Sequence, residues 1–223
     1  MSQLLVRELG HQPYEPVWRA MQEFTNTRDE STPDEIWFCE HESVFTLGLN
    51  TRPEHLLAPG DIPVIQIDRG GQVTYHGPGQ LMIYPLIDLR RAGLGVRDLV
   101  TALEQCVVDL ASDYGIEAAS RCDAPGVYID GVKLASVGLR IRRGCSFHGM
   151  ALNVDVDLEP FSRINPCGFE GLELTDLARL GADSSLDTVR DKLLPHLLRH
   201  LKFDQVFSSA SLAGVPTSLQ RPA

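Results

Sequence analysis

The chain lacks any long hydrophobic run, and this absence excludes the simplest kind of membrane protein. No apolar stretch in the 223 residues approaches the length of a membrane-spanning helix. The first residues also lack the long apolar core of a secretory signal peptide. With 43% hydrophobic and 22% charged residues, the composition is that of an ordinary globular protein. We therefore expect a cytoplasmic protein with no membrane association.

Positive charge and paired cysteines are also scarce. The formal net charge is −10, which argues against nucleic acid as a partner because that partner requires a basic face. The five cysteines contain no CxxC pair, so no disulfide framework is indicated. Cys145 and His148 stand three apart, but further ligands at a sensible spacing are missing, and we expect no metal site. There is no GxGxxG or P-loop pattern to indicate a nucleotide phosphate site.

The pattern of apolar residues predicts a single α+β domain with a mixed or antiparallel β-sheet flanked by helices. Helical spacing over residues 13–28, 95–114 and 186–201 indicates three helices, the last one bent by Pro195. Strands outnumber helices without regular βαβ alternation. Strands are expected at 36–39 and 44–47, paired as a hairpin or meander, and at 63–67, 72–75, 81–85, 127–129, 132–139 and 147–154. We expect the domain to cover residues 1–207, and the polar segment 208–223 to be a disordered tail.

Four segments stand out because each combines small or glycine residues with a residue able to do chemistry. They are Arg69–Gln80, Gly131–Gly138, His148–Asp155 and Ile164–Gly168. Lys133 lies in the second segment, on a predicted strand that follows a tight Asp-Gly turn. Taken by itself, this position favours the exposed face of an edge strand, since a buried ammonium group is costly.

Cys167 differs from the other cysteines in its surroundings. Cys106 lies on an apolar helix face and Cys39 on an apolar strand, as is typical of small buried hydrophobes. Cys167 instead stands between a proline and a glycine in an irregular stretch, which makes it a candidate nucleophile. A thiol attacks as the thiolate, which a neighbouring ammonium group favours. If folding brings Lys133 to Cys167, the two form an acyl-transfer centre.

In order and spacing, the four segments resemble those of the lipoyl(octanoyl) transferase family. The resemblance implies the fold of biotin and lipoate protein ligases, and a catalytic pair of Cys167 as nucleophile and Lys133 as its activator and proton relay. It implies transfer of an octanoyl group from octanoyl-acyl carrier protein, through a cysteine thioester, to a lysine ε-amine. The acceptors it implies are lipoyl domains of 2-oxoacid dehydrogenase complexes and the glycine cleavage H protein. It implies a monomer and no cofactor.

The resemblance also implies an acyl pocket made largely of small residues. His76 and His148 fall near it, and for His76 we favour a hydrogen-bonding role over that of a catalytic base. The residues expected to bind substrate are Arg69, Gly70, Gly71, Gln72, Val73, Thr74, Tyr75, His76, Ser136, Val137, Gly138, Gly149, Met150 and Ala151.

Three other functions compete with this interpretation. An ATP-dependent lipoate or biotin ligase would not need the cysteine, and no ATP motif is recognisable. A transferase that moves octanoyl between lipoyl domains would use a cysteine but a different donor. A non-catalytic acyl-binding module would need neither Lys133 nor Cys167. An acidic carrier protein would have to dock on a local patch drawn from Arg69, Arg90, Arg91, Lys133, Arg140, Arg142 and Arg143.

Overall fold

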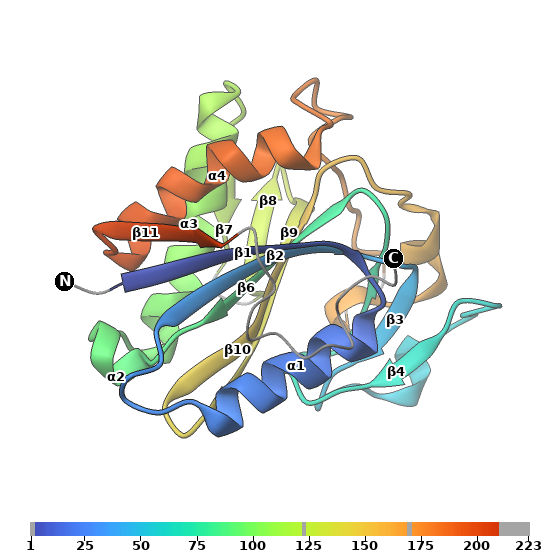
Figure 1. Ribbon diagram of the computed structural model, residues 1–223. Helices are drawn as coiled ribbons and strands as arrows, with labels where there is room; N and C mark the ends of the chain where they lie inside the picture. Colours follow the sequence, from blue (N-terminus) through green and yellow to red (C-terminus); the bar gives the residue numbers. More distant parts are fainter. Residues whose placement is uncertain (1–2, 122–123, 169–170, 210–223) are drawn as a thin grey trace, which may run out of the picture.

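A large mixed β-sheet runs through the computed structural model, which describes residues 3–121, 124–168 and 171–209 (Figure 1). Its strands lie in the spatial order β11 (Gln205–Ser209), β1 (Gln3–Gln12), β2 (Asp34–His41), β6 (Gln80–Leu86), β10 (Cys145–Asn153), β9 (Val132–Arg142), β8 (Gly126–Ile129) and β7 (Ala119–Ser120). Strand β1 pairs in parallel with β2 and β11, and the other neighbours are antiparallel. The predicted α+β class with a mixed sheet is confirmed.

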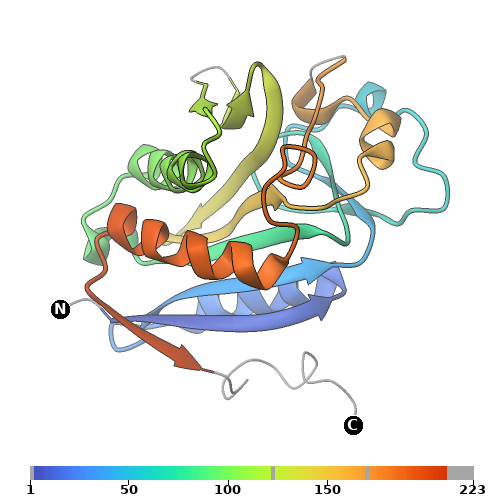
Figure 2. The same cartoon turned by 90° about the horizontal axis from the view of Figure 1, so that it is seen from above.

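Helices cover both faces of this sheet (Figure 2). Helix α1 (Tyr14–Thr27) packs on one face, and α3 (Val96–Asp113) and α4 (Leu186–Leu201) pack together on the other. The apolar residues that predicted α3 recur every three or four positions and are buried, which is why this sequence folds as an amphipathic helix. A short α2 (Leu89–Ala92) follows β6. No helix among the described residues is long and apolar enough to cross a membrane.

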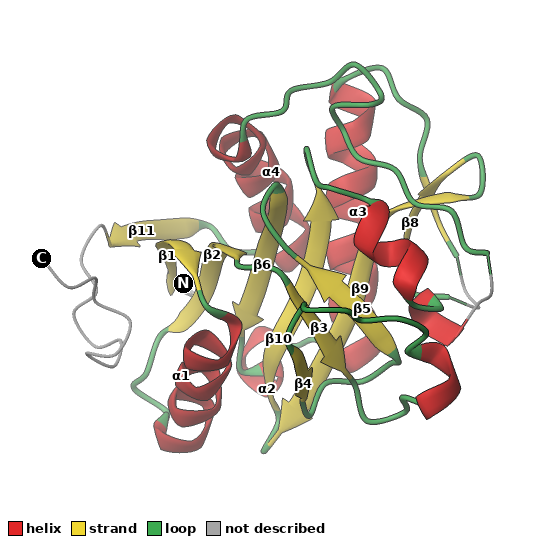
Figure 3. Cartoon of the chain, turned by 90° about the vertical axis from the view of Figure 1, so that its right-hand side faces the viewer, coloured by secondary structure: helices red, strands yellow, loops and turns green. Residues whose placement is uncertain are grey.

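A second, smaller sheet lies beside the first and carries part of the glycine-rich Arg69–Gln80 segment (Figure 3). It consists of β4 (Val64–Gln66), β3 (Val44–Leu47) and β5 (Val73–His76). The predicted strands 36–39 and 44–47 therefore exist, but their expected pairing is wrong. Strand β2 already has β1 and β6 on its two edges, so β3 has no free edge to join and pairs with β4 and β5 instead.

The tight Asp-Gly turn predicted before Lys133 is confirmed, and a second glycine-containing turn forms a hairpin at the other end of β9. Asp130 and Gly131 have φ of 51° and 86°, and Arg143 and Gly144 have φ of 53° and 82°. Two successive positive φ values match the twist of the flanking strands, which is why glycine occupies the second position in each turn. These hairpins fix β9 between β8 and β10, so that Lys133 lies at a defined place in the sheet.

Both ends of the chain contain strands that the apolar pattern did not predict. Strand β1 begins at Gln3, and β11 extends to Ser209, two residues into the predicted tail. Residues 210–223 of that tail lie outside the described part of the chain. The irregular region 155–171 contains the 3₁₀ turns η2 (Glu159–Arg163) and η3 (Pro166–Gly168), and η1 (Pro53–His55) lies earlier in the chain.

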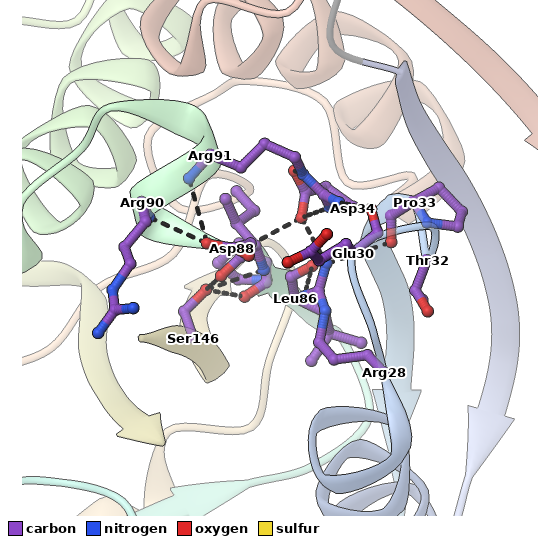
Figure 4. A network of polar contacts seen from close by, with 12 residues as sticks. Arg28, Glu30, Thr32, Pro33, Asp34, Leu86, Asp88, Arg90, Arg91 and Ser146 are labelled. Carbon is purple, nitrogen blue, oxygen red and sulfur yellow. Dashed lines mark hydrogen bonds and ion pairs between the residues drawn. The ribbon is translucent and has the colours of Figure 1, made fainter. Parts of the chain in front are cut away.

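A buried carboxylate joins three elements at the end of the sheet opposite η3. Asp34, at the start of β2, is 1% exposed and accepts hydrogen bonds from Arg28 after α1 and from Arg91 in α2, each at 2.7 Å. The backbone N–H of Asp88 donates to the same oxygen at 2.8 Å (Figure 4). Because its charge is neutralised from two sides, this carboxylate can remain buried and hold α1, α2 and β2 together.

Candidate active site

A cavity lies against β9 and β10, beneath the Arg69–Gln80 segment. Every residue that was expected to bind substrate lines it, except Gly70 and Tyr75. Tyr14, Met82, Tyr84 and His148 line it as well. Tyr14 and Tyr84 were hidden from sequence analysis because one lies on the apolar face of a helix and the other in a continuous buried strand.

Gly70 and Tyr75, the two expected residues that do not line the cavity, contact other parts of the protein. Gly70 places its N–H against the carbonyl oxygen of Leu139 at 3.0 Å, which ties the segment to β9. The ring of Tyr75 packs against Phe45 and Phe161, and its hydroxyl bonds to the Ser43 hydroxyl at 2.9 Å. Tyr75 therefore supports the segment from the side away from the cavity.

Glycine in β10 allows close packing behind the cavity. A Cβ atom at Gly149 would lie 1.9 Å from the carbonyl oxygen of Ile83 on β6. At Gly138, the Cβ would lie 3.1 Å from Cδ of Arg69. Glycine therefore stands where β10 packs against β6 and where β9 packs against Arg69, because a side chain at either position would clash.

A directed chain of hydrogen bonds begins at Arg69 and fixes His76. Arg69 Nη2 donates to the Thr46 hydroxyl at 3.0 Å, which leaves that hydroxyl to donate to Nε2 of His76 at 3.3 Å. Nδ1–H of His76 then donates to Oε1 of Gln80 at 2.7 Å. Burial, helped by the Arg69 charge, holds the pKa of His76 well below its ordinary value. His76 is thus a neutral hydrogen-bonding residue, in the role we favoured for it, with both ring nitrogens already engaged.

The same chain of hydrogen bonds continues to the strand that carries Lys133. Gln80 Nε2 donates to Oδ1 of Asn153 at 2.9 Å, and Asn153 Nδ2 donates to the carbonyl oxygen of Thr175 at 3.0 Å. The Thr175 N–H donates to the carbonyl oxygen of Lys133, and the Lys133 N–H donates to Glu173, both at 2.9 Å. The floor of the cavity and the backbone of Lys133 are therefore held by one network.

Lys133 is fully buried, so the exposed edge-strand alternative is wrong. Strand β9 lies between β8 and β10, and the segment 173–175 pairs with Lys133 along its free backbone groups. Its Nζ atom lies 5.3 Å from the centroid of the Tyr128 ring, within the range of a cation–π contact. An aromatic face offsets part of the cost of burying the ammonium group.

Gly126 and Glu104 lie beside Lys133, although neither was among the predicted site residues. Gly126 has a φ of 141°, and a Cβ there would lie 2.8 Å from Cε of Lys133. Its N–H donates to the buried carboxylate of Glu104 on α3 at 2.7 Å. Burial raises the pKa of Glu104, while this hydrogen bond and the Lys133 charge lower it. The carboxylate therefore supplies negative charge close to the lysine, and in sequence it was concealed on a helix.

Cys167 lies in the middle of η3, and its side chain is outside the described part of the structure. The turn is closed by the Gly168 N–H, which donates to the carbonyl oxygen of Asn165 at 3.0 Å. A Cβ at Gly168 would lie 3.3 Å from Nε2 of the cavity residue Gln72. Asn165 and Pro166 also line a surface groove, and residues 132 and 173–175 line the same groove. The turn thus lies near both the cavity and the Lys133 strand, and the Cys167–Lys133 pair remains a prediction.

The other described cysteines are not activated. Cys39 and Cys106 are buried, and burial raises the pKa of each thiol. Burial also raises the pKa of the Cys145 thiol. A thiol with a raised pKa is a poor nucleophile at neutral pH.

The predicted basic patch is smaller in the structure than in the sequence. Arg69 and Lys133 are buried and cannot belong to a docking surface. Arg91 is paired with Asp34, and Arg142 lies 3.4 Å from the Asp68 carboxylate. Among the expected members, Arg90, Arg91 and Arg143 are exposed near the β9–β10 turn, and Arg140 and Arg142 are half-buried.

Comparison with known proteins places this geometry in a family. Residues 13–198 match the model of the lipoyl protein ligase A/B catalytic domain. An octanoyltransferase of Pseudomonas fluorescens (strain Pf0-1) is 59% identical over 197 residues, covering 88% of this chain and 92% of that protein. An octanoyltransferase of Xanthomonas campestris pv. campestris is 59% identical over 194 residues, covering 87% of this chain and 84% of that protein.

Solved structures show the same fold at low sequence identity. A bi-partite lipoate protein ligase from Thermoplasma acidophilum superposes with a TM-score of 0.74 at 16% identity, covering 99% of this chain and 92% of that one. The biotin protein ligase of Aquifex aeolicus gives a TM-score of 0.52 at 14% identity, covering 91% and 70%. The chain belongs to the lipoyl protein ligase A/B catalytic domain family and, within it, to the octanoyltransferases.

Proposed function

We propose that this chain transfers an octanoyl group from octanoyl-acyl carrier protein to the ε-amine of a lysine on a lipoyl domain, with Cys167 as nucleophile. The observation that carries the proposal is a cavity lined by β9, the strand that carries the fully buried Lys133, with the Cys167 turn adjacent to the lining residue Gln72. The 59% identity to octanoyltransferases supports the choice of acyl group. The lining combines glycine, serine and alanine with apolar side chains such as Met82 and Met150, which suits an unbranched chain, at about 0.8 kcal/mol per buried methylene.

The first step forms an acyl-enzyme. The thiolate of Cys167 attacks the thioester carbonyl of the donor, and the bond from that carbonyl to the carrier sulfur breaks. Lys133 gives a proton to the departing carrier thiolate and becomes a neutral amine. Backbone N–H groups at the mouth of the cavity are suited to stabilise the negative carbonyl oxygen that develops during the attack.

The second step transfers the acyl group to nitrogen. The ε-amine of the acceptor lysine attacks the Cys167 thioester, the carbon–sulfur bond breaks, and Lys133 accepts the proton that the amine loses. Thioester to amide is a downhill exchange, and so no ATP is consumed. Lipoyl domains of 2-oxoacid dehydrogenase complexes and the glycine cleavage H protein are the acceptors we propose. A monomeric state and a cytoplasmic location remain predictions.

Intact-protein mass spectrometry tests the first step directly. The protein is mixed with octanoyl-acyl carrier protein in the absence of ATP and acceptor, beside the Cys167→Ser variant. We expect the wild type to gain one octanoyl group that hydroxylamine removes, and the variant to gain no such thioester adduct. The Cys106→Ser variant is the matched control, because Cys106 is buried in the core and should leave loading intact.

The same experiment separates the competing functions. An adduct that forms only from an octanoylated lipoyl domain would favour transfer between domains. A requirement for ATP and free octanoate would favour a ligase. No adduct from either donor would contradict covalent catalysis by Cys167.

A further inference from the structure

A histidine that no sequence pattern indicated lies beside the Cys167 turn. We infer that His55 is a further catalytic residue, which donates a hydrogen bond to the carbonyl oxygen of the thioester at Cys167. The inference rests on the proposed function, because it names a group that stabilises the negative oxygen formed in both of its steps. His55 is half-buried at the end of η1 and was not among the predicted site residues.

The backbone of His55 is attached to the segment that leads into Cys167. The Asn165 N–H donates to the carbonyl oxygen of His55 at 2.8 Å. The carbonyl oxygen of Asn165 in turn accepts the Gly168 N–H at 3.0 Å, which closes η3 around Cys167. Through Asn165, the histidine and the turn are therefore held in a fixed relation to each other. A group fixed in this way needs little rearrangement to act on a substrate at the turn.

The imidazole ring is directed at the residue that follows Cys167. A Cβ atom at Gly168 would lie 3.3 Å from Nε2 of His55 and 3.3 Å from Nε2 of Gln72. Gln72 lines the cavity, so the space beside Gly168 lies between the histidine and the cavity lining. In an acyl-enzyme, the thioester carbonyl is bonded directly to the Cys167 sulfur, and its chain leads into the cavity. The carbonyl group therefore belongs in this space, which glycine leaves open.

The buried side of the ring indicates where its proton lies. Among the described residues, Nδ1 of His55 is buried and has no hydrogen-bond partner. A buried N–H group without an acceptor is rarer in proteins than an unpaired buried acceptor. The ring therefore carries its proton on Nε2, the nitrogen that is directed at the turn. His55 thus presents a hydrogen-bond donor to the space beside Gly168.

A donor in this place lowers the barrier of both acyl-transfer steps. When the Cys167 thiolate attacks the donor thioester, the electron pair of the carbonyl bond moves to oxygen, and it returns as the carrier thiolate leaves. The same oxygen becomes negative again when the acceptor amine attacks the acyl-enzyme. A hydrogen bond from Nε2–H is stronger to this oxyanion than to the neutral carbonyl. The ring gains and loses no proton in this role, and Lys133 remains the proton carrier.

Two substitutions distinguish a hydrogen-bond donor from a proton carrier. His55→Gln keeps an N–H group near the position of Nε2 but cannot exchange a proton at neutral pH, whereas His55→Phe keeps a ring and removes the donor. Loading from saturating octanoyl-acyl carrier protein is followed by intact-protein mass spectrometry. We expect His55→Phe to slow loading by about a hundred- to a thousandfold, and His55→Gln to stay within about tenfold of the wild type. Glu54→Gln is the matched control, because Glu54 lies in the same 3₁₀ turn with its side chain 61% exposed.

Infrared spectroscopy of the acyl-enzyme detects the hydrogen bond itself. The acyl-enzyme is made from a donor whose carbonyl carbon is isotopically labelled, so that its stretching band can be separated from those of the protein. A hydrogen bond weakens the carbonyl double bond and lowers its stretching frequency. We expect a higher frequency in His55→Phe than in the wild type and in Glu54→Gln. A role of His55 in structure alone would leave this frequency unchanged.

The outcomes separate this inference from the proposed function. A wild type that is loaded by no donor contradicts the proposed function, and the role of His55 with it. If the wild type is loaded, a folded His55→Phe variant that loads equally fast, or that has an unchanged carbonyl frequency, overturns the role of His55 and leaves the function intact. Equal slowing in His55→Gln and His55→Phe also overturns it, because loss of a proton carrier would then explain both variants.

Discussion

At the scale of single residues, the buried position of Lys133 is the feature that most separates structure from sequence. A lysine after a hairpin turn is most simply an exposed residue of an edge strand, but here β8, β10 and the segment 173–175 enclose it. Fully burying an ammonium group is expensive. The surroundings supply an aromatic face and a nearby carboxylate, from Tyr128 and Glu104. Such an arrangement is typical of a group retained for its chemistry.

Lys133→Met tests whether this lysine serves chemistry more than stability. Methionine keeps the length and packing of the side chain, and Glu104, whose pKa is already raised by burial, can take up a proton once the lysine charge is gone. We expect octanoyl loading of Cys167 to slow by about a hundredfold or more. The free energy of unfolding, measured in urea, should change by less than about 1.5 kcal/mol. Loading at the wild-type rate would remove Lys133 from the mechanism.

Gly126→Ala tests how tightly the lysine is held. The new Cβ would lie 2.3 Å from the carbonyl oxygen of Ala135 and 2.8 Å from Cε of Lys133, at a φ of 141°. We expect a loss of roughly 2–5 kcal/mol in stability, from overpacking and backbone strain together, with slower loading. Gly115→Ala is the matched control, because its φ is 74° and no atom lies within 4 Å of the added Cβ.

The control variant, Gly115→Ala, should lose stability through backbone strain alone. Gly115→Ala is expected to cost about 1–2 kcal/mol and to leave loading unchanged. Unfolding in urea and the loading rate are measured on both variants. Equal losses of stability in both would contradict the tight contact at Gly126, since only the conformational cost is common to the two sites.

At the scale of elements, the helices and the hairpins beside β9 follow from local patterns, whereas the pairing of β3 does not. The repeats that predicted α1, α3 and α4 agree with the observed bounds within about two residues, because an amphipathic helix is encoded by its own sequence. The pairing of β3 depended on which edges of β2 were already taken. That is a property of the whole sheet. Strand β1 was missed because its partners, β2 and β11, lie far along the chain.

Some residues of the candidate site could be predicted from local sequence patterns, and others could not. The glycine-rich Arg69–Gln80 segment and the small residues of β9 and β10 were found in the sequence, because closely packed backbone requires such residues. Tyr14 and Glu104 reach the site from helices and Tyr84 from a buried strand, and nothing in those local patterns distinguishes them from core residues.

The Asp34 network predicts a large effect far from the site. In Asp34→Asn the side chain keeps its shape but no longer neutralises Arg28, whose side chain is 4% exposed. Breaking one partner of a buried ion pair costs about 3–5 kcal/mol, and we expect the midpoint of urea unfolding to fall accordingly. Glu15→Gln removes an exposed pair with Arg19, so its cost should stay below about 1 kcal/mol. Similar small effects in both variants would show that the network does not join α1, α2 and β2.

At the scale of the whole molecule, the cavity lies where the two sheets and α1 meet, and buried polar residues line their junction. His41 at the end of β2 is fully buried; its Nδ1–H donates to the carbonyl oxygen of Gln12 at 2.9 Å, and its Nε2 accepts from the Tyr84 hydroxyl at 2.8 Å. His76 lies close by, and burial lowers the pKa of both His41 and His76. Their protonation should therefore couple to global stability.

Burial lowers the pKa of His41 from 6.5 to about 4. Between these values the unfolded chain binds more protons than the folded one, so the free energy of unfolding rises with pH in this window. His41 stabilises the fold fully above about pH 6.5, and that stability is lost as the pH falls towards 4. At 1.36 kcal/mol per pKa unit, this one group contributes roughly 3 kcal/mol, and His76 acts in the same direction.

Urea unfolding of the wild type and of His41→Gln from pH 4.5 to 8 measures this contribution. The glutamine amide can still donate to Gln12 but cannot be protonated in this range. We therefore expect the variant to lose less stability than the wild type on acidification, while both curves are parallel above pH 7, where the histidine is neutral in both states. Parallel curves over the whole range would mean that His41 gains no proton on unfolding, and that acid sensitivity arises elsewhere in the fold.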